Sequence, residues 1–216
     1  MAQSPSIGLE IPVKAGTVIE KIDRITIAHK KVNYWSLLNR QAHKTILLSL
    51  FDSQTGKRWD ETVKPITLAE QGELLYQRWI KKRQEETEKL SGGKLGFMHV
   101  RAMDNEGFRA FYEQALGKYP NKEGLIVDTR FNPGGWLHDD LATFLGGKKY
   151  LDFIPRERKI GEEPGNKWRR SSVVLMSEGN YSDGHMFPVV YKTLGIGKLV
   201  GMPVAGTGTA VWWENL

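Results

Sequence analysis

Two short loops carry the residues whose types and spacing could do chemistry. Residues 132–135 read Asn-Pro-Gly-Gly, residues 179–184 read Gly-Asn-Tyr-Ser-Asp-Gly, and each loop stands between an apolar run and a helical pattern. Because catalytic groups in an open α/β sheet gather at the carboxyl ends of the strands, we expect both loops at that edge. A nucleophile in one loop and anion-binding amides in the other would suit attack on a carbonyl group.

Ser182 is the candidate nucleophile. It stands at a sharp turn between a predicted strand and a predicted helix, where a serine exposes its hydroxyl and the helix N-terminus stabilises negative charge. The backbone amide of Asp183 would face the same space. Serine and aspartate are also the preferred N-caps of helices, so the local sequence taken alone favours a plain capping role.

Gly134 and Gly135 would let a backbone amide approach a ligand with no side chain in the way. An oxyanion-hole donor at this point would stabilise a transition state by roughly 3–4 kcal/mol. The alternative is an ordinary Pro-Gly turn, which is the more common use of such residues.

A serine nucleophile needs a base within hydrogen-bond reach, and the chain has five histidines. His185 follows Ser182 by one helical turn, and His99 lies at the end of a predicted strand, so these two are the candidates within the chain. None of the five stands in a recognisable triad or metal-binding spacing. The absence of cysteine excludes thiol catalysis, disulfides and cysteine-ligated zinc, and we expect neither a metal nor an organic cofactor.

The elements that must position these loops fall into three segments. Residues 1–67 predict a small module of strands and one helix, residues 68–92 an amphipathic helix that ends at glycines, and residues 93–216 a layered α/β sheet with helices on its faces. In the first segment we expect strands at 9–28, 45–51 and 59–66 and a helix at 33–42. In the third we expect strands at 95–100, 125–127, 173–176 and 199–200, helices at 105–118, 136–145 and 185–194, a polar loop at 151–170 and half of a hairpin at 204–214.

The net charge of +6 and the sequence pI of about 9.4 raise the question of an anionic partner. Many of the basic residues stand in the segment 156–170, which could bind nucleic acid, but a solvated surface is the more common interpretation of such a run. The apolar stretches are far shorter than the roughly 20 residues that a membrane span needs. We therefore expect neither nucleic acid nor a membrane as a partner.

Three segments taken together resemble the catalytic core of the tricorn and tail-specific (C-terminal-processing) serine protease superfamily. The strand and glycine loop of tricorn proteases are similar to Gly124-Leu-Ile-Val-Asp-Thr-Arg-Phe-Asn-Pro-Gly-Gly-Trp136. Their nucleophile segment is similar to Ser177-Glu-Gly-Asn-Tyr-Ser-Asp-Gly-His-Met-Phe-Pro188, and the strand that opens their core to Lys94-Leu-Gly-Phe-Met-His-Val100. The order and separation of the segments also fit.

The resemblance implies roles for particular residues. Ser182 aligns with the nucleophile, and the amides of Asp183 and Gly135 align with the two oxyanion-hole donors, with Gly134 beside the substrate. Asp152 aligns with an acidic residue that selects basic side chains. Residues 5–66 resemble the PDZ-like domain that precedes the core, through the segment Ala15-Gly-Thr-Val-Ile-Glu-Lys-Ile-Asp23.

The same resemblance implies a serine endopeptidase that acts on peptide or protein substrates, in a homo-oligomer, in the cytoplasm or after export. The family's general base is a histidine upstream of the PDZ-like domain, and its final tetrad member is a glutamate downstream of the core. We therefore expect this chain to be a fragment with little activity alone, since an unactivated serine is a weak nucleophile. The alternative is a peptide-binding or assembly module without chemistry.

Overall fold

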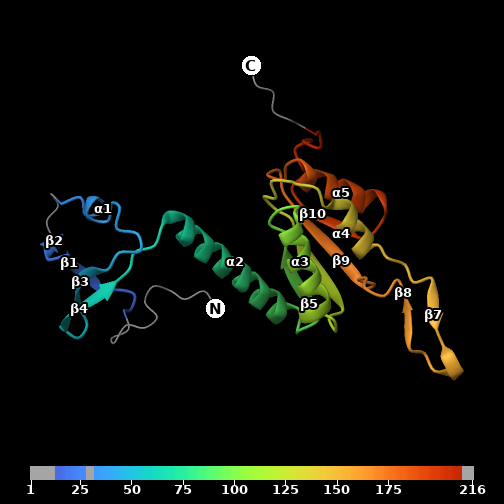
Figure 1. Cartoon of the computed structure of the whole chain (residues 1–216), viewed down its shortest axis with the longest axis horizontal. Coiled ribbons are helices and arrows are strands. Elements are labelled where there is room, and N and C mark those ends of the chain that lie inside the picture. The colour runs from blue at the N-terminus through green and yellow to red at the C-terminus, as the bar shows by residue number, and fades with distance from the viewer. Residues whose placement is uncertain (1–12, 28–31, 211–216) are drawn as a thin grey trace, which may run out of the picture. The chain divides into compact units, whose positions relative to one another are not determined.

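The computed structural model describes residues 13–27 and 32–210 (Figure 1). The chain divides into two compact units, Met1–Trp79 and Ile80–Leu216. The first 12 residues of the module expected at 1–67 lie outside the described residues.

The first unit is built on a four-stranded antiparallel sheet in the order β2-β1-β3-β4. Its core is small and apolar, with Ile22, Ile46 and Leu50 almost fully buried. β3 and β4 pair along their whole length, as expected for two strands on either side of the turn that begins at Asp52. The elements are β1 (Val18–Ile22), β2 (Ile25–Thr26), α1 (Tyr34–Leu37), β3 (Ile46–Phe51) and β4 (Arg58–Val63).

The helix expected at residues 33–42 is a single turn, α1, capped by the side chain of Asn33. The backbone takes positive φ at Arg40 and again at His43, which helical residues cannot do. The amide of His43 then donates to the carbonyl of Pro65 at 2.8 Å and so joins this turn to the chain after β4. The apolar spacing of the segment was compatible with a longer helix, but a tertiary hydrogen bond competes with it.

Helix α2 (Leu68–Leu90) has the bounds that the sequence predicts. It starts with a capping box, in which the Thr67 amide donates to the Glu70 carboxylate at 2.8 Å and the Glu70 amide donates to the Thr67 hydroxyl at 3.2 Å. Gly92 and Gly93 end it with positive φ, as left-handed residues after a helix do. No helix within residues 13–27 and 32–210 has the length and apolar character to cross a bilayer.

The second unit is an α/β layer structure whose parallel sheet has the order β10-β9-β6-β5 (Figure 1). Strands and helices alternate along the chain, so the predicted α/β fold class is confirmed. The strands are β5 (Leu95–His99), β6 (Gly124–Asp128), β9 (Ser171–Met176) and β10 (Lys198–Gly201). The helices are α3 (Asn105–Glu113), its π-helical continuation η1 (Gln114–Lys118), α4 (His138–Leu145) and α5 (Asp183–Thr193).

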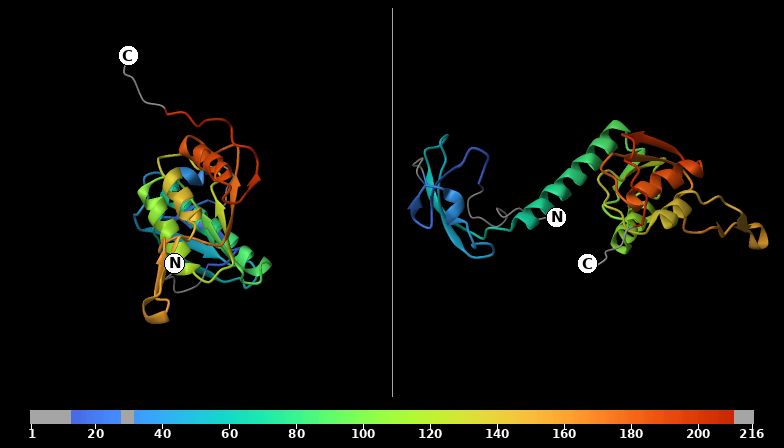
Figure 2. Two further views of the ribbon diagram at one scale, coloured as in Figure 1. Left: turned by 90° about the vertical axis from the view of Figure 1, so that its right-hand side faces the viewer. Right: turned by 90° about the horizontal axis from the view of Figure 1, so that it is seen from above.

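The core lies between one face of this sheet and the helices α3, α4 and α5, which Figure 2 shows from two further directions. Each fully buried large apolar side chain contributes about 1.5–3 kcal/mol to stability. The strands supply Met98, Leu125, Val127 and Val174 to this core, and the helices supply Phe111, Leu141, Phe144, Phe187 and Tyr191. On the other face, Phe97, Ile126 and Leu175 line a cavity of about 470 Å³ with the C-terminal half of α2.

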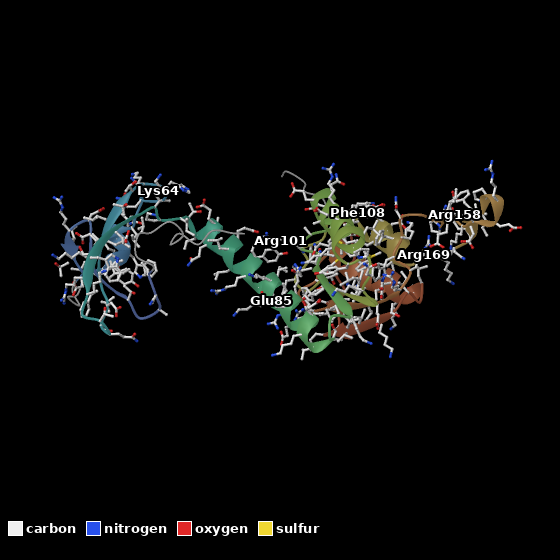
Figure 3. All side chains as sticks on the ribbon, turned by 90° about the horizontal axis from the view of Figure 1, so that it is seen from below. Lys64, Glu85, Arg101, Phe108, Arg158 and Arg169 are labelled. Carbon is white, nitrogen blue, oxygen red and sulfur yellow. The ribbon has the colours of Figure 1, made fainter. Side chains whose placement is uncertain are left out.

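Residues 151–163 form a two-stranded antiparallel ribbon, where the sequence suggested only a polar loop. Its strands are β7 (Leu151–Phe153) and β8 (Gly161–Glu163), joined through the 3₁₀ turn η2 (Pro155–Glu157). Figure 3 shows the ribbon extending away from the layered core, with Arg158 at its far end and Arg169 near its base. Backbone hydrogen bonds join the two strands, and ion pairs among lysines and carboxylates lie across them. None of the ribbon's side chains is fully buried, which explains why apolar periodicity did not reveal it.

The half-hairpin expected at residues 204–214 is not formed in its described part. Strand β10 ends at Gly201, and residues 202–210 contain no strand. The segment instead lies against the start of α5, where the hydroxyl of Thr207 donates to the carbonyl of Asn180 at 3.3 Å. Residues 211–214 lie outside the described residues.

Candidate active site

Two loops leave neighbouring strands at the same edge of the parallel sheet. β6 and β9 pair in parallel with Asp128 opposite Leu175, so the glycine loop (residues 129–137) and the serine loop (residues 177–182) begin side by side. Each leads into a helix, α4 or α5, and these two helices pack together (Figure 1). The expectation that both loops lie at the carboxyl ends of the strands is met.

Ser182 has a backbone conformation that only glycine adopts easily, with φ 50° and ψ −121°. Such a conformation costs of order 1–3 kcal/mol and persists only where the surrounding structure enforces it. Although Ser182 occupies the N-cap position of α5, its side chain makes no capping hydrogen bond. The capping role that the local sequence favoured is therefore wrong, and the hydroxyl is available for another purpose.

Asn180 holds the serine loop in place. Its side chain is about 1% exposed, accepts the Ser177 amide at 3.1 Å and donates to the Thr129 hydroxyl at 3.0 Å and the Gly184 carbonyl at 2.9 Å. The Gly184 carbonyl has no donor four residues later in the helix, because that residue is Pro188, which lacks an N–H. The proline thus leaves free the carbonyl that Asn180 uses.

Asn132 does the same for the glycine loop and joins the two loops. Its buried side chain donates to the Val100 carbonyl at 2.8 Å and accepts the Gly134 amide at 2.8 Å. Its backbone carbonyl accepts the Tyr181 amide at 2.9 Å, directly beside Ser182. Neither Asn132 nor Asn180 was among the site residues predicted from the sequence. Their position in short loops after buried strands was the available signal.

The glycines are required by close contacts as well as by positive φ, which is 101° at Gly134 and 137° at Gly135. A Cβ atom on Gly134 would lie 2.7 Å from the Cβ of Ser182 and 3.0 Å from the amide nitrogen of Asp183. A Cβ atom on Gly135 would overlap the carbonyl of Met103. The glycine loop therefore presses its backbone directly against the serine loop.

The amides of Gly135 and Asp183, the two candidate oxyanion donors, have no acceptor among the described residues. The Gly134 amide donates to the Asn132 side chain. On either side of Gly135, the Met103 amide donates to the Gly134 carbonyl at 2.9 Å and the Trp136 amide donates to the Met103 carbonyl at 2.7 Å. The Gly135 amide itself therefore has no acceptor among the described residues. The other donor is the amide of Asp183, at the positive end of the α5 dipole. Two such amides beside a serine hydroxyl can bind an anion that forms on that hydroxyl's target.

The side chain of Asp183 contacts the other loop, which the sequence did not reveal. Its carboxylate is about 3% exposed and accepts the Leu137 amide at 2.5 Å, the His138 amide at 3.0 Å and the His138 Nδ1. The partners are 45 and 46 residues apart in sequence, so no local pattern points to the contact. The one available signal was Leu137, an apolar residue at a helix start that normally carries a polar cap.

Both histidines that the sequence offered as a base make structural hydrogen bonds. The Nδ1 of His185 accepts the Thr207 amide at 3.1 Å, which occupies its basic nitrogen. The Nε2 of His99 faces the Arg130 carbonyl at 3.2 Å and therefore carries the proton, and burial is the main reason that the pKa of His99 lies below its usual value. Within the described residues, no base is hydrogen-bonded to Ser182.

Asp152 lies in β7 of the ribbon rather than in either loop. Its carboxylate binds the Lys149 ammonium at 2.7 Å and the Lys159 ammonium at 2.8 Å, and these hydrogen bonds, that of Lys149 first, lower its pKa. The ribbon extends away from the core (Figure 3). In the part of the chain that the structure describes, no group of three or more His, Cys, Asp or Glu side chains could hold a metal ion.

A sequence profile of peptidase family S41 matches residues 94–216, which include both loops. The chain belongs to peptidase family S41. This match confirms the expected protease family, and the relatives described next confirm the resemblance to tricorn proteases.

Individual relatives of this S41 chain carry the tricorn name. A tricorn protease from Thermoplasma acidophilum is 28% identical over 86% of this chain and 17% of its own length. A tricorn protease homolog from Saccharolobus solfataricus is 33% identical over 68% of this chain and 13% of its own length. The crystal structure of the tricorn protease superposes with a TM-score of 0.73 and 26% identity, covering 93% of this chain and 19% of that one. The chain thus spans less than a fifth of the length of each of these relatives.

Proposed function

We propose that this S41 chain carries the nucleophile and the oxyanion hole of a serine endopeptidase. The observation that carries the proposal is Ser182, whose backbone is strained, whose hydroxyl does not cap its helix, and which stands beside the amides of Gly135 and Asp183. Strain on a side-chain-bearing residue next to two unpaired donors is typical of a catalytic serine turn.

In the proposed reaction, the Oγ of Ser182 attacks the carbonyl carbon of a peptide bond and loses its proton to a base. The carbonyl oxygen becomes an oxyanion, which the Gly135 and Asp183 amides bind. The intermediate then expels the protonated amine and leaves an acyl group on Ser182, and water hydrolyses this ester. Because the described residues offer Ser182 no base, the proposal assigns that role to a group outside them, in the same polypeptide or in another subunit.

The finer features of the proposal follow the same family. We infer a peptide or protein substrate, with Asp152 selecting basic side chains, in a cytoplasmic or exported homo-oligomer. The ion pairs of Asp152 support a role that needs a carboxylate kept charged. We also infer that residues 1–67 act as a PDZ-like domain and residues 93–216 as the protease core, with residues 68–92 as the helix between them.

The test is covalent labelling with a fluorophosphonate, read by intact mass. It uses the 216-residue chain and the full reading frame that encodes it, each as wild type and as Ser182→Ala. One adduct on the full-frame wild type that is lost in Ser182→Ala supports the proposal, and little labelling of the short chain supports an external base. Folded protein that is not labelled at either length overturns the catalytic proposal and favours a non-catalytic peptide-binding module.

A further inference from the structure

Helix α4 has no cap of its own. Its N-cap position is occupied by Leu137, which is about 3% exposed and offers no side-chain acceptor to the first amides of the helix. The acceptor comes instead from Asp183, the first residue of α5, whose carboxylate binds the amides of Leu137 and His138. One side chain thus closes the start of α4 while its own backbone starts α5.

The imidazole of His138 completes this arrangement. Its Nδ1 donates to the second oxygen of the same carboxylate, and the ring stands edge-on to Trp136 with 5.7 Å between the ring centroids. A carboxylate removed from water is unfavourable unless its oxygens are hydrogen-bonded, and here both oxygens are. We call this pair, with its two backbone contacts, the Asp183–His138 clasp.

The clasp lies next to both candidate oxyanion donors. The Gly135 amide is two residues before Leu137, and the other donor is the amide of Asp183 itself. The clasp therefore joins the two backbone segments that carry the candidate donors.

We propose that Asp183 and His138 are positioning residues that set the spacing of the two oxyanion donors. The inference rests on the proposed function, because it takes the Gly135 and Asp183 amides as those donors. His138 acts through the carboxylate of Asp183 and does not exchange a proton with Ser182. Oxyanion holes need such support, because a donor displaced by a fraction of an ångström loses much of its effect.

The absence of cysteine in the chain allows a test that needs no catalytic base. Ser182→Cys places a single thiol at the candidate site, and the two amides should stabilise its thiolate. The pH midpoint of alkylation by iodoacetamide then reports on the donors. Ser171→Cys, on an exposed residue at the opposite end of β9, is the reference thiol, and we expect a lower midpoint at position 182.

The decisive variants are made in the Ser182→Cys background. His138→Leu removes the third hydrogen bond, and we expect it to raise the midpoint by about one pH unit, which is about tenfold slower labelling at neutral pH. His138→Asn keeps an N–H donor near the Nδ1 position and should restore most of the effect. If His138→Leu does not fold, His138→Gln, whose amide extends toward the Nε2 position, takes its place.

Three outcomes separate this inference from the proposed function. A low midpoint for the Ser182→Cys thiol that folded His138→Leu leaves unchanged overturns the positioning role and leaves the oxyanion site intact. A higher midpoint in His138→Leu that His138→Asn restores supports the positioning role of the clasp, even if the protein encoded by the full reading frame is inactive. If the protein encoded by the full reading frame is active, His138→Leu should lower its kcat with little change in KM. Loss of all fluorophosphonate labelling of Ser182 in folded His138→Asn would identify His138 as a base and overturn the inference.

Discussion

The glycine loop and the serine loop both need positive φ at a sharp turn, and they use different residues to adopt it. Both leave buried parallel strands, turn sharply and enter a helix, and where they meet both need positive φ. The glycine loop meets this need with Gly134 and Gly135, which adopt such angles without strain. The serine loop meets it with Ser182, which does not.

The difference shows what each loop contributes. Where the backbone alone is needed, as for the Gly135 amide, the sequence uses glycine. Where a side chain is needed, the chain keeps a serine and accepts the conformational cost, and buried asparagine hydrogen bonds enforce the geometry. Where the loops meet, the strained Ser182 thus marks a side-chain function, and the unstrained Gly134 and Gly135 mark a backbone function. The contrast holds at this contact alone, because Phe131 in the glycine loop also has positive φ (63°).

The largest effect on stability is expected when a glycine of the glycine loop is replaced. Gly135→Ala adds a Cβ that overlaps the Met103 carbonyl and should destabilise the chain by about 4 kcal/mol, measured by urea denaturation. Gly195→Ala is the matched control, because Gly195 also has positive φ (61°) but open space around its Cβ position. Equal losses in the two variants would mean that φ alone, not the contact between loops, requires the glycine.

The asparagine supports come next. Asn132→Ala should cost about 2–3 kcal/mol in the free energy of unfolding, because it leaves the Gly134 amide and the Val100 carbonyl buried without partners. Asn180→Ala should cost a similar amount, since the two side chains play equivalent parts in the two loops. Asn121→Ala, at an exposed position, should change stability by less than about 0.5 kcal/mol. A small loss at Asn132 would contradict its role as the support of the glycine loop.

Relief of the strain at Ser182 gives a smaller effect of opposite sign. Ser182→Gly should be about 1 kcal/mol more stable than Ser182→Ala, because the gain at φ 50° exceeds the entropy that glycine loses. The same pair of substitutions at Ser171, in strand β9, should show alanine as the more stable. Thermal unfolding of the four variants measures both stability differences. If glycine and alanine have the same order of stability at both positions, backbone strain at Ser182 is contradicted.

The smallest effect concerns pH and the neighbour of the glycine loop, His99. Burial lowers its pKa in the folded state, so below about pH 6.5 the unfolded state binds the proton first and the free energy of unfolding falls. Urea denaturation of wild type and His99→Gln between about pH 7.5 and 5.5 should show the steeper fall in wild type. Parallel curves for the two proteins would show that His99 contributes nothing to the pH dependence.

The sequence predicted the elements best where periodicity and termination signals agreed. Helix α2 is an example, since an amphipathic pattern runs up to Gly92 and Gly93. The buried strands β6 and β9 were also clear, because continuous apolar runs preceded the two loops. The helix around Tyr34 was overestimated because a hydrogen bond to Pro65 competes with it, and the ribbon at 151–163 was missed because none of its side chains is fully buried.

At the candidate site the sequence indicated residues but not their conformations. It named Ser182, Gly135 and Asp183 from their loops and from resemblance. It could not show that the Ser182 hydroxyl does not cap α5, because that depends on its φ and ψ. Nor could it show the Asp183–His138 clasp, which forms only when two strands and two helices have come together.

Pro188 has a consequence beyond the shape of helix α5. By withholding an N–H from the Gly184 carbonyl, it makes that oxygen available to Asn180 without competition. A residue other than proline at position 188 would supply a backbone N–H that competes with Asn180 for the Gly184 carbonyl. A substitution of Asn180 alone would leave that carbonyl without either donor. We therefore expect residues 180 and 188 to covary among related sequences, so that a substitution at one position is accompanied by a substitution at the other.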